Sequence, residues 1–193
     1  GSGGNNGSNG SGTNTNLLTA QNANIDMHAS PGKDHERRDP VLRPVPAGEK
    51  RDGKTVHKMT MDVQELDREI APGLDVKAWT FNGSYMGPVL HGKLGDVFEI
   101  TLENNGSMGH SLDFHAGMVS PDNTMKTIAP GEKLTYRFEA TGSGIWLYHC
   151  STAPMSLHMA AGMYGAVIID PPNLEPVDHE YVMVQNETYL TDT

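Results

Sequence analysis

The sequence predicts an all-β fold, a Greek-key β-sandwich preceded by a disordered N-terminal linker. From Thr55 onward, short stretches rich in β-branched and aromatic residues are separated by turns that Gly, Pro and Asn mark, such as Asn82-Gly83. No stretch has the apolar periodicity of a helix longer than a turn or two. Several short strands at this spacing are typical of a Greek-key sandwich.

The first fifty residues differ in composition from the rest of the chain. Residues 1–12 contain only Gly, Ser and Asn, a composition typical of a flexible linker. Residues 13–50 are polar, with four prolines and a charged cluster at 33–39. We therefore expect residues 1–50 to be a linker, and the roughly 140 residues that follow are enough for one domain with its own core.

The expected strands follow one another at short intervals. The clearest lies at 133–140, where apolar residues alternate with polar ones, the pattern of a half-buried antiparallel strand. We expect one sandwich domain over 51–172. Residues 173–193 would then be a linker and the first strand of a second domain that this chain lacks. The expected strands are 55–63, 76–81, 97–103, 111–115, 133–140, 144–150, 165–170 and 180–190.

Composition excludes several classes of protein. The formal net charge of −10 argues against nucleic acid as a partner. A single cysteine rules out a disulfide within the chain. The sequence contains no recognisable signal peptide and no apolar stretch of the length that crosses a membrane.

The only cysteine begins a motif that indicates a metal site. His158 follows Cys150 after eight residues, and Met163 follows after five more. A thiolate, an imidazole and a thioether suit a soft, redox-active metal, and two histidines with a cysteine and a weak axial methionine form the blue-copper arrangement. His110 is available as the second histidine.

Strand geometry sorts the remaining histidines. Successive side chains of a strand point to opposite faces. His149 directly precedes Cys150, and His110 and His115 are five residues apart, so an unbroken strand would split each pair between two faces. One face then offers His110 and Cys150, and the other offers His115 and His149. Asp113 shares the face of His115 and is a candidate proton donor or acceptor.

Two histidines are too few to close a metal site. A third ligand from another subunit or domain would leave an open position for a substrate. The strand end at Cys150 therefore predicts a complete copper site on one face and an incomplete one on the other.

Several stretches of the segment 79–190 carry a resemblance to a known family, namely Phe81-Asn82-Gly83, Gly87-Pro88, 110–115, 129–132, Tyr148-His149-Cys150 and 158–165. With these stretches the segment resembles the first cupredoxin domain of the copper-containing nitrite reductases and their two-domain multicopper oxidase relatives. The resemblance implies a cupredoxin-like sandwich. The resemblance further implies that type 1 copper is bound by His110, Cys150, His158 and Met163, that type 2 copper is bound by His115 and His149, and that the catalytic acid is Asp113.

The implied activity is the reduction of nitrite to nitric oxide. Type 1 copper would take an electron from a small donor protein, a cupredoxin or a cytochrome c, and the Cys150–His149 peptide would carry it to type 2 copper. The resemblance also implies a homotrimer, a second cupredoxin domain that supplies the third type 2 histidine, and a periplasmic or extracellular location. Membrane anchoring through the N-terminal linker is left open.

Two other functions are compatible with parts of the sequence. A laccase-like multicopper oxidase would need many His-x-His pairs, and this chain has none, while Ser151 follows Cys150. A plain blue-copper electron-transfer protein would explain the single domain. It would leave His115, His149 and Asp113 without a role.

Overall fold

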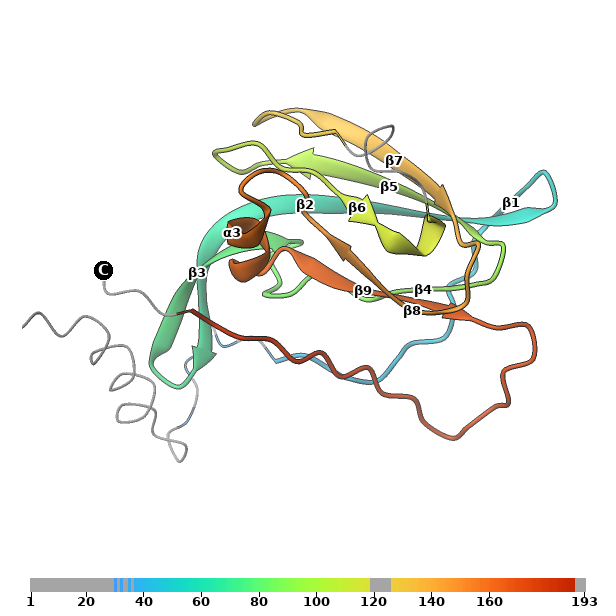
Figure 1. The fold of residues 1–193 in the computed structure, drawn as a ribbon. Coiled ribbons are helices and arrows are strands. Elements are labelled where there is room, and N and C mark those ends of the chain that lie inside the picture. The colour runs from blue at the N-terminus through green and yellow to red at the C-terminus, as the bar shows by residue number, and fades with distance from the viewer. Residues whose placement is uncertain (1–29, 31, 33–34, 36, 119–125, 190–193) are drawn as a thin grey trace, which may run out of the picture.

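The computed structural model describes residues 30, 32, 35, 37–118 and 126–189, and it shows two curled sheets packed as a sandwich (Figure 1). This confirms the predicted all-β sandwich. The first sheet contains, in order, β1 (Glu49–Arg51), β2 (Lys54–Ala71), β5 (Val97–Asn104) and β7 (Lys133–Glu139), with β3 (Leu74–Phe81) paired to β2. The second contains β4 (Leu90–Lys93), β9 (Tyr164–Asp170), β8 (Gly144–His149) and β6 (Asp113–Phe114). The predicted disorder of residues 1–29 lies outside the described residues.

Each sheet mixes parallel and antiparallel pairs. β2 pairs with β5 in parallel from Val56↔Val97 to Val63↔Asn104, and β4 pairs with β9 in parallel. Parallel neighbours cannot be joined by a tight hairpin, so the chain crosses between the sheets to connect them. The end of β5, the start of β6 and the end of β8 lie toward the same end of the sandwich (Figure 1).

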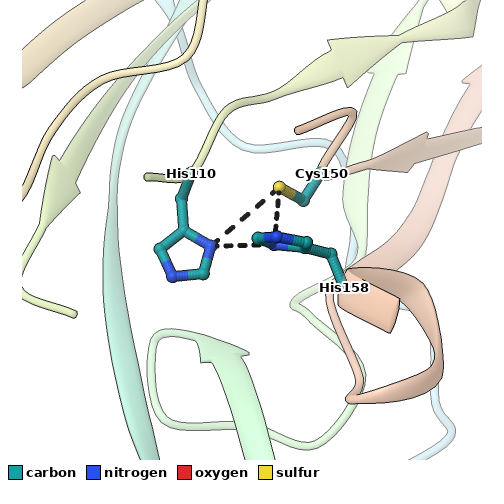
Figure 2. A group of neighbouring side chains, drawn as sticks. All are labelled: His110, Cys150 and His158. Atoms are coloured by element: carbon teal, nitrogen blue, oxygen red, sulfur yellow. Dashed lines mark hydrogen bonds between the residues drawn. The ribbon is translucent and has the colours of Figure 1, made fainter. Parts of the chain in front are cut away.

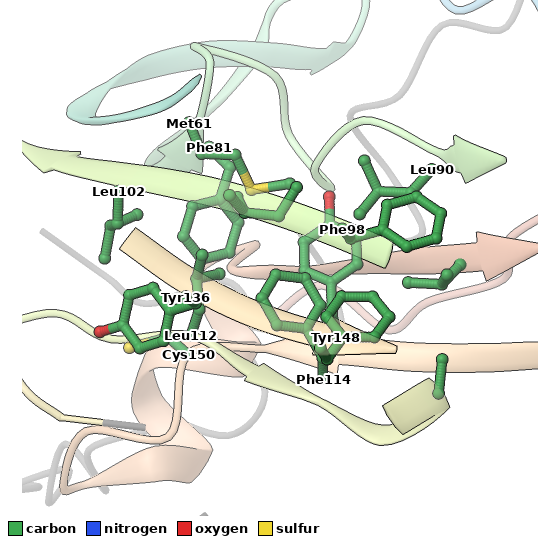
Figure 3. Packing of buried hydrophobic residues seen from close by; sticks show 14 of the residues in the cluster. Met61, Phe81, Leu90, Phe98, Leu102, Leu112, Phe114, Tyr136, Tyr148 and Cys150 are labelled. Carbon is green, nitrogen blue, oxygen red and sulfur yellow. The ribbon is translucent and has the colours of Figure 1, made fainter. Parts of the chain in front are cut away.

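An aromatic cluster joins the two sheets. The ring of Phe138 stacks on that of Phe98 at 4.9 Å and on that of Phe114 at 4.7 Å. Tyr148 lies beside them, fully buried, and donates a 2.6 Å hydrogen bond from its hydroxyl to the carbonyl oxygen of Pro88. Figure 3 shows Cys150 at the margin of this cluster, so the apolar core forms one wall of the predicted metal site.

The predicted strands are found with shifted ends, and some elements were missed. β2 runs eight residues past the expected end at Val63, because its second half, which pairs with β3, lacks a clear apolar alternation. The short strands β1 and β4 and the helix α3 (Met155–Ala160) were not predicted. The expected strand 111–115 is reduced to the two residues of β6, and the 3-10 helix η1 (His115–Gly117) follows it.

The predicted strand at 180–190 is wrong over its described part, 180–189. Tyr181 forms only an isolated bridge with Val41, flanked by two backbone hydrogen bonds. The facing segment contains Pro40, Pro44 and Pro46, which lack the N–H groups that a longer ladder would need. Leu190 lies outside the described residues.

The described part of the segment expected as a linker lies against the sandwich. The guanidinium of Arg38 donates hydrogen bonds to the carbonyl oxygens of Tyr85, Met86 and Gly87. β1 begins at Glu49, before the expected start of the domain at residue 51. In the part of the chain that the structure covers, no helix has the length and apolar character needed to cross a membrane.

Replacing Phe138 by alanine tests the aromatic cluster. The change removes the ring that stacks on both Phe98 and Phe114, so we expect the free energy of unfolding to fall by about 3–5 kcal/mol in equilibrium urea denaturation. The control is Ile145→Ala, which truncates a side chain 79% exposed and should change stability by less than about 0.5 kcal/mol. If Phe138→Ala lowers the free energy of unfolding no more than the control does, the description of the core is contradicted.

Candidate metal centre

Three buried side chains from separate parts of the fold converge at one end of the sandwich (Figure 2). The Sγ atom of Cys150 lies 3.3 Å from Nδ1 of His158 and 4.0 Å from Nδ1 of His110, and the two Nδ1 atoms are 3.1 Å apart. His110 and Cys150 are fully buried and His158 is 2% exposed. Together with Met163 they are called here the first ligand group.

The backbone folds the loop after β8 back onto itself. Cys150 directly follows this strand, and its N–H donates to the carbonyl oxygen of Met163 at 3.0 Å. The N–H of Met163 donates in turn to the carbonyl oxygen of His158, in α3, at 3.1 Å. Met163 is fully buried. Because both bonds join backbone atoms, the fold itself brings these three residues together.

His110 reaches the same place from another part of the chain. Its N–H donates to the carbonyl oxygen of Ile128, and the N–H of Ile128 donates back at 2.9 Å. This pair of hydrogen bonds fixes the backbone that carries the histidine. Trp79 packs its ring at 4.9 Å from that of His158 and at 6.0 Å from that of His110, so it restrains both imidazoles.

Electrostatics favour the metal-binding form of the thiol. Burial works to raise the pKa of Cys150, but the contact with His110 and hydrogen bonds from the backbone of Thr152 and Ser111 outweigh it, and the pKa lies below its ordinary value. Burial likewise works to lower the pKa of His110, yet the interactions with Cys150 and Glu65 raise it. Burial and the neighbouring His110 lower the pKa of His158. A thiolate with two imidazoles and a thioether is the donor set that suits copper.

A second group lies on the opposite side of the strand end. Nε2 of His115 is 3.1 Å from Nε2 of His149, and Oδ2 of Asp113 is 3.8 Å and 3.6 Å from these two nitrogens. His149 is buried, whereas the side chain of His115 is 45% exposed, so the group opens toward solvent at His115. These three residues are called here the second ligand group.

A hydrogen bond sets the tautomer of His149. Its Nδ1 lies 2.9 Å from the carbonyl oxygen of Cys150, which can only accept, so Nδ1 carries the proton. The lone pair of the neutral ring is then on Nε2, which faces His115 and Asp113. The ring of His149 is therefore oriented to act as a ligand.

The structure brings together the residues that strand alternation grouped, with one difference in local geometry. His149 and Cys150 do point to opposite sides at the end of β8. The expected unbroken strand 111–115 is wrong, because His115 is the first residue of η1. Asp113 is placed instead by its pairing with His149 across β6 and β8.

Sequence reasoning missed two residues that contact the first ligand group, Glu65 and Trp79. Oε1 of Glu65 lies 3.1 Å from Nε2 of His110. Glu65 in β2 is paired directly opposite Trp79 in β3. Both are far from the Cys–His–Met motif in sequence. Only the long hairpin, which the strand pattern did not reveal, brings them to the site.

Comparison with known proteins identifies matching families. Residues 62–174 match a family model described as multicopper oxidase. The chain is 34% identical over 149 residues to the copper-containing nitrite reductase of Neisseria meningitidis serogroup A, which covers 75% of this chain and 39% of that protein. It is 41% identical over 103 residues to the copper-containing nitrite reductase of Alcaligenes xylosoxydans xylosoxydans, covering 51% of this chain and 31% of that protein.

The similar solved structures include members of the same two groups of proteins. A copper nitrite reductase from Nitrosomonas europaea superposes with a TM-score of 0.61 and 38% identity, covering 66% of this chain and 47% of that one. A crystal structure of a multicopper oxidase superposes with a TM-score of 0.63 and 37% identity, covering 72% of this chain and 53% of that one. The chain thus spans about two fifths of the length of the Neisseria relative, 39%, and about half of these solved chains.

Replacing His110 by alanine tests the first ligand group. We expect at least about a hundredfold loss of copper affinity and loss of the visible thiolate-to-copper charge-transfer band, because one of the donors disappears. Copper titration followed by visible absorption measures both. His179→Ala, which changes an exposed histidine outside both groups, is the control and should leave the titration unchanged. An unaltered band in His110→Ala would contradict the assignment.

Proposed function

Because the chain belongs to the multicopper oxidase family, we propose that it reduces nitrite to nitric oxide, with electrons entering at the first ligand group and nitrite reacting at the second. The chain is a copper-binding cupredoxin domain with a type 1-like site made of His110, Cys150, His158 and Met163. The observation that carries the proposal is that the two groups lie back to back at one strand end. The names of the nitrite reductase relatives support it.

The residues between the two groups form a short covalent connection. When bound, copper would supply one-electron redox chemistry at the first group and a binding position for nitrite at the second. Cys150 and His149 are adjacent, so a single peptide bond links the thiolate to the imidazole of the second group. The hydrogen bond from Nδ1 of His149 to the carbonyl oxygen of Cys150 adds a second contact along this connection.

Asp113 is the proposed proton donor. Reduction of nitrite by one electron consumes two protons and gives nitric oxide and water. The carboxyl group of Asp113 lies within 4 Å of both imidazole Nε2 atoms. It is therefore close enough to donate a hydrogen bond to an oxygen of nitrite held there, and to deliver a proton as the N–O bond breaks. Solvent at the exposed His115 would return the proton to Asp113, which would then deliver the second proton that the reaction consumes.

The second ligand group needs a further ligand. Among the described residues it offers two imidazoles as ligands, and the carboxylate beside them, Asp113, is assigned to proton transfer. We propose that a histidine from another copy of the chain or from a second cupredoxin domain completes it, in a homotrimer. A small cupredoxin or cytochrome c would be the electron donor, and the location would be the periplasm or the cell exterior.

A plain electron-transfer protein is the second candidate. It is favoured by one observation: the first ligand group is complete and buried within the described chain, whereas the second is partly open. Copper content separates the candidates, because a carrier holds one copper and the enzyme two. His115→Ala should remove one of two bound coppers from the enzyme and none from a carrier.

Replacing Asp113 by asparagine tests the catalytic proposal. Asparagine keeps the size of the side chain and removes the acidic proton, so we expect nitrite turnover to fall by about a hundredfold or more while both coppers remain bound. A nitrite-turnover assay with a chemical reductant measures the activity, and metal analysis measures the copper content. Asp67→Asn, which changes an exposed carboxylate paired with Lys77, is the control and should retain full turnover. Undiminished turnover in Asp113→Asn would remove this residue from the mechanism.

A further inference from the structure

The two ring nitrogens of His110 have different surroundings. Nδ1 faces Cys150 and His158, whereas Figure 2 shows the other nitrogen directed away from both. This second nitrogen, Nε2, lies 3.1 Å from Oε1 of Glu65 in β2. An ionised carboxylate only accepts hydrogen bonds, so Nε2 carries the proton and Nδ1 of the neutral ring keeps its lone pair for a metal.

The turn after β5 holds the carboxylate in place. Oε1 of Glu65 accepts a hydrogen bond from the N–H of Ser107 at 2.9 Å, and Oε2 accepts one from the Ser107 hydroxyl at 2.6 Å. Gly106 permits the close approach: a Cβ atom there would lie 2.5 Å from Oε1 of Glu65 and 3.1 Å from Nε2 of His110. The side chain of Asn104 fixes the turn by accepting from the N–H of Gly106 at 3.0 Å.

Burial makes the charge of this carboxylate effective. His110 is fully buried, and the side chain of Glu65 is only 19% exposed. A charge interaction is stronger here than in water, and a carboxylate that accepts from a ligand histidine orients the ring and raises its basicity. With the thiolate of Cys150, Glu65 brings two negative charges to the site. These balance Cu(II), whereas Cu(I) leaves an uncompensated negative charge in a buried place.

We propose that Glu65 is a positioning residue that lowers the reduction potential of copper in the first ligand group through its hydrogen bond to Nε2 of His110. The proposal rests on copper binding at the first ligand group. It does not depend on nitrite reduction, so the two can fail separately.

Replacing Glu65 by glutamine tests the proposal, because glutamine keeps the shape and removes the charge. We expect the affinity for Cu(II) relative to Cu(I) to fall at least about tenfold, which raises the reduction potential by about 59 mV. A redox titration of the charge-transfer band on the copper-loaded chain measures the shift. Glu69→Gln is the control. It removes the same charge roughly 13 Å further along β2, and it should change the affinity for Cu(II) relative to Cu(I) by less than about twofold. A potential for Glu65→Gln that matches the control, or lies below that of the unmodified chain, overturns the proposal.

A second variant keeps the charge of Glu65 and disturbs its contact with Nε2 of His110. In Gly106→Ala the added Cβ displaces Oε1 of Glu65, so the potential should rise, by less than in Glu65→Gln. In NMR spectra of the Cu(I)-loaded chain, the Nε2–H proton of His110 should resonate downfield and exchange slowly, and should move upfield in both variants. If Glu65→Gln does not retain copper, Gly106→Ala decides: an unchanged potential and an unchanged N–H resonance overturn the proposal.

The unmodified chain separates this proposal from the proposed function. Absence of a copper charge-transfer band would overturn the role of Glu65 together with the first ligand group. Normal copper binding without nitrite turnover would contradict the proposed function alone.

Discussion

The close approach of one thiol and two imidazoles inside an apolar core is the constraint on which the rest of the structure depends. Polar groups buried in this way lose their hydration and need partners. The backbone supplies part of the solution: the hydrogen bonds that join Cys150 to Met163 and Met163 to His158 define the loop after β8 and the start of β9. The lone pairs that face one another between Cys150, His110 and His158 are those that a copper ion would satisfy.

The same strand end determines the second ligand group. Because successive side chains of β8 alternate, placing Cys150 toward the core places His149 on the other side. The cross-strand partner of His149 is Asp113, and η1 then turns His115 back toward both. A buried first ligand group and an open, solvent-facing second ligand group are thus two consequences of one pair of adjacent residues.

Much of this arrangement was predictable from sequence, and the exceptions have physical causes. Turn residues and the alternation at 133–139 locate the strands, and the spacing of Cys150, His158 and Met163 indicates the metal, because these signals are local. The long hairpin of β2 and β3 was not predictable, since its second half lacks a clear apolar alternation. The contact between Glu65 and His110 depends on that hairpin and on a turn without a side chain at Gly106. The strand expected at 180–190 is not formed over 180–189, because the segment that faces it contains prolines, a property of the partner and not of the segment itself.

The most direct test of the account is electron paramagnetic resonance of the copper-loaded chain, recorded with and without nitrite. The central claim is that both ligand groups at this strand end hold copper. It predicts a type 1 signal together with a type 2 signal, and a change in the type 2 signal alone when nitrite is added. A type 1 signal alone, unaffected by nitrite, would contradict the claim and would mean that the chain is an electron carrier or one half of an enzyme that needs a partner domain.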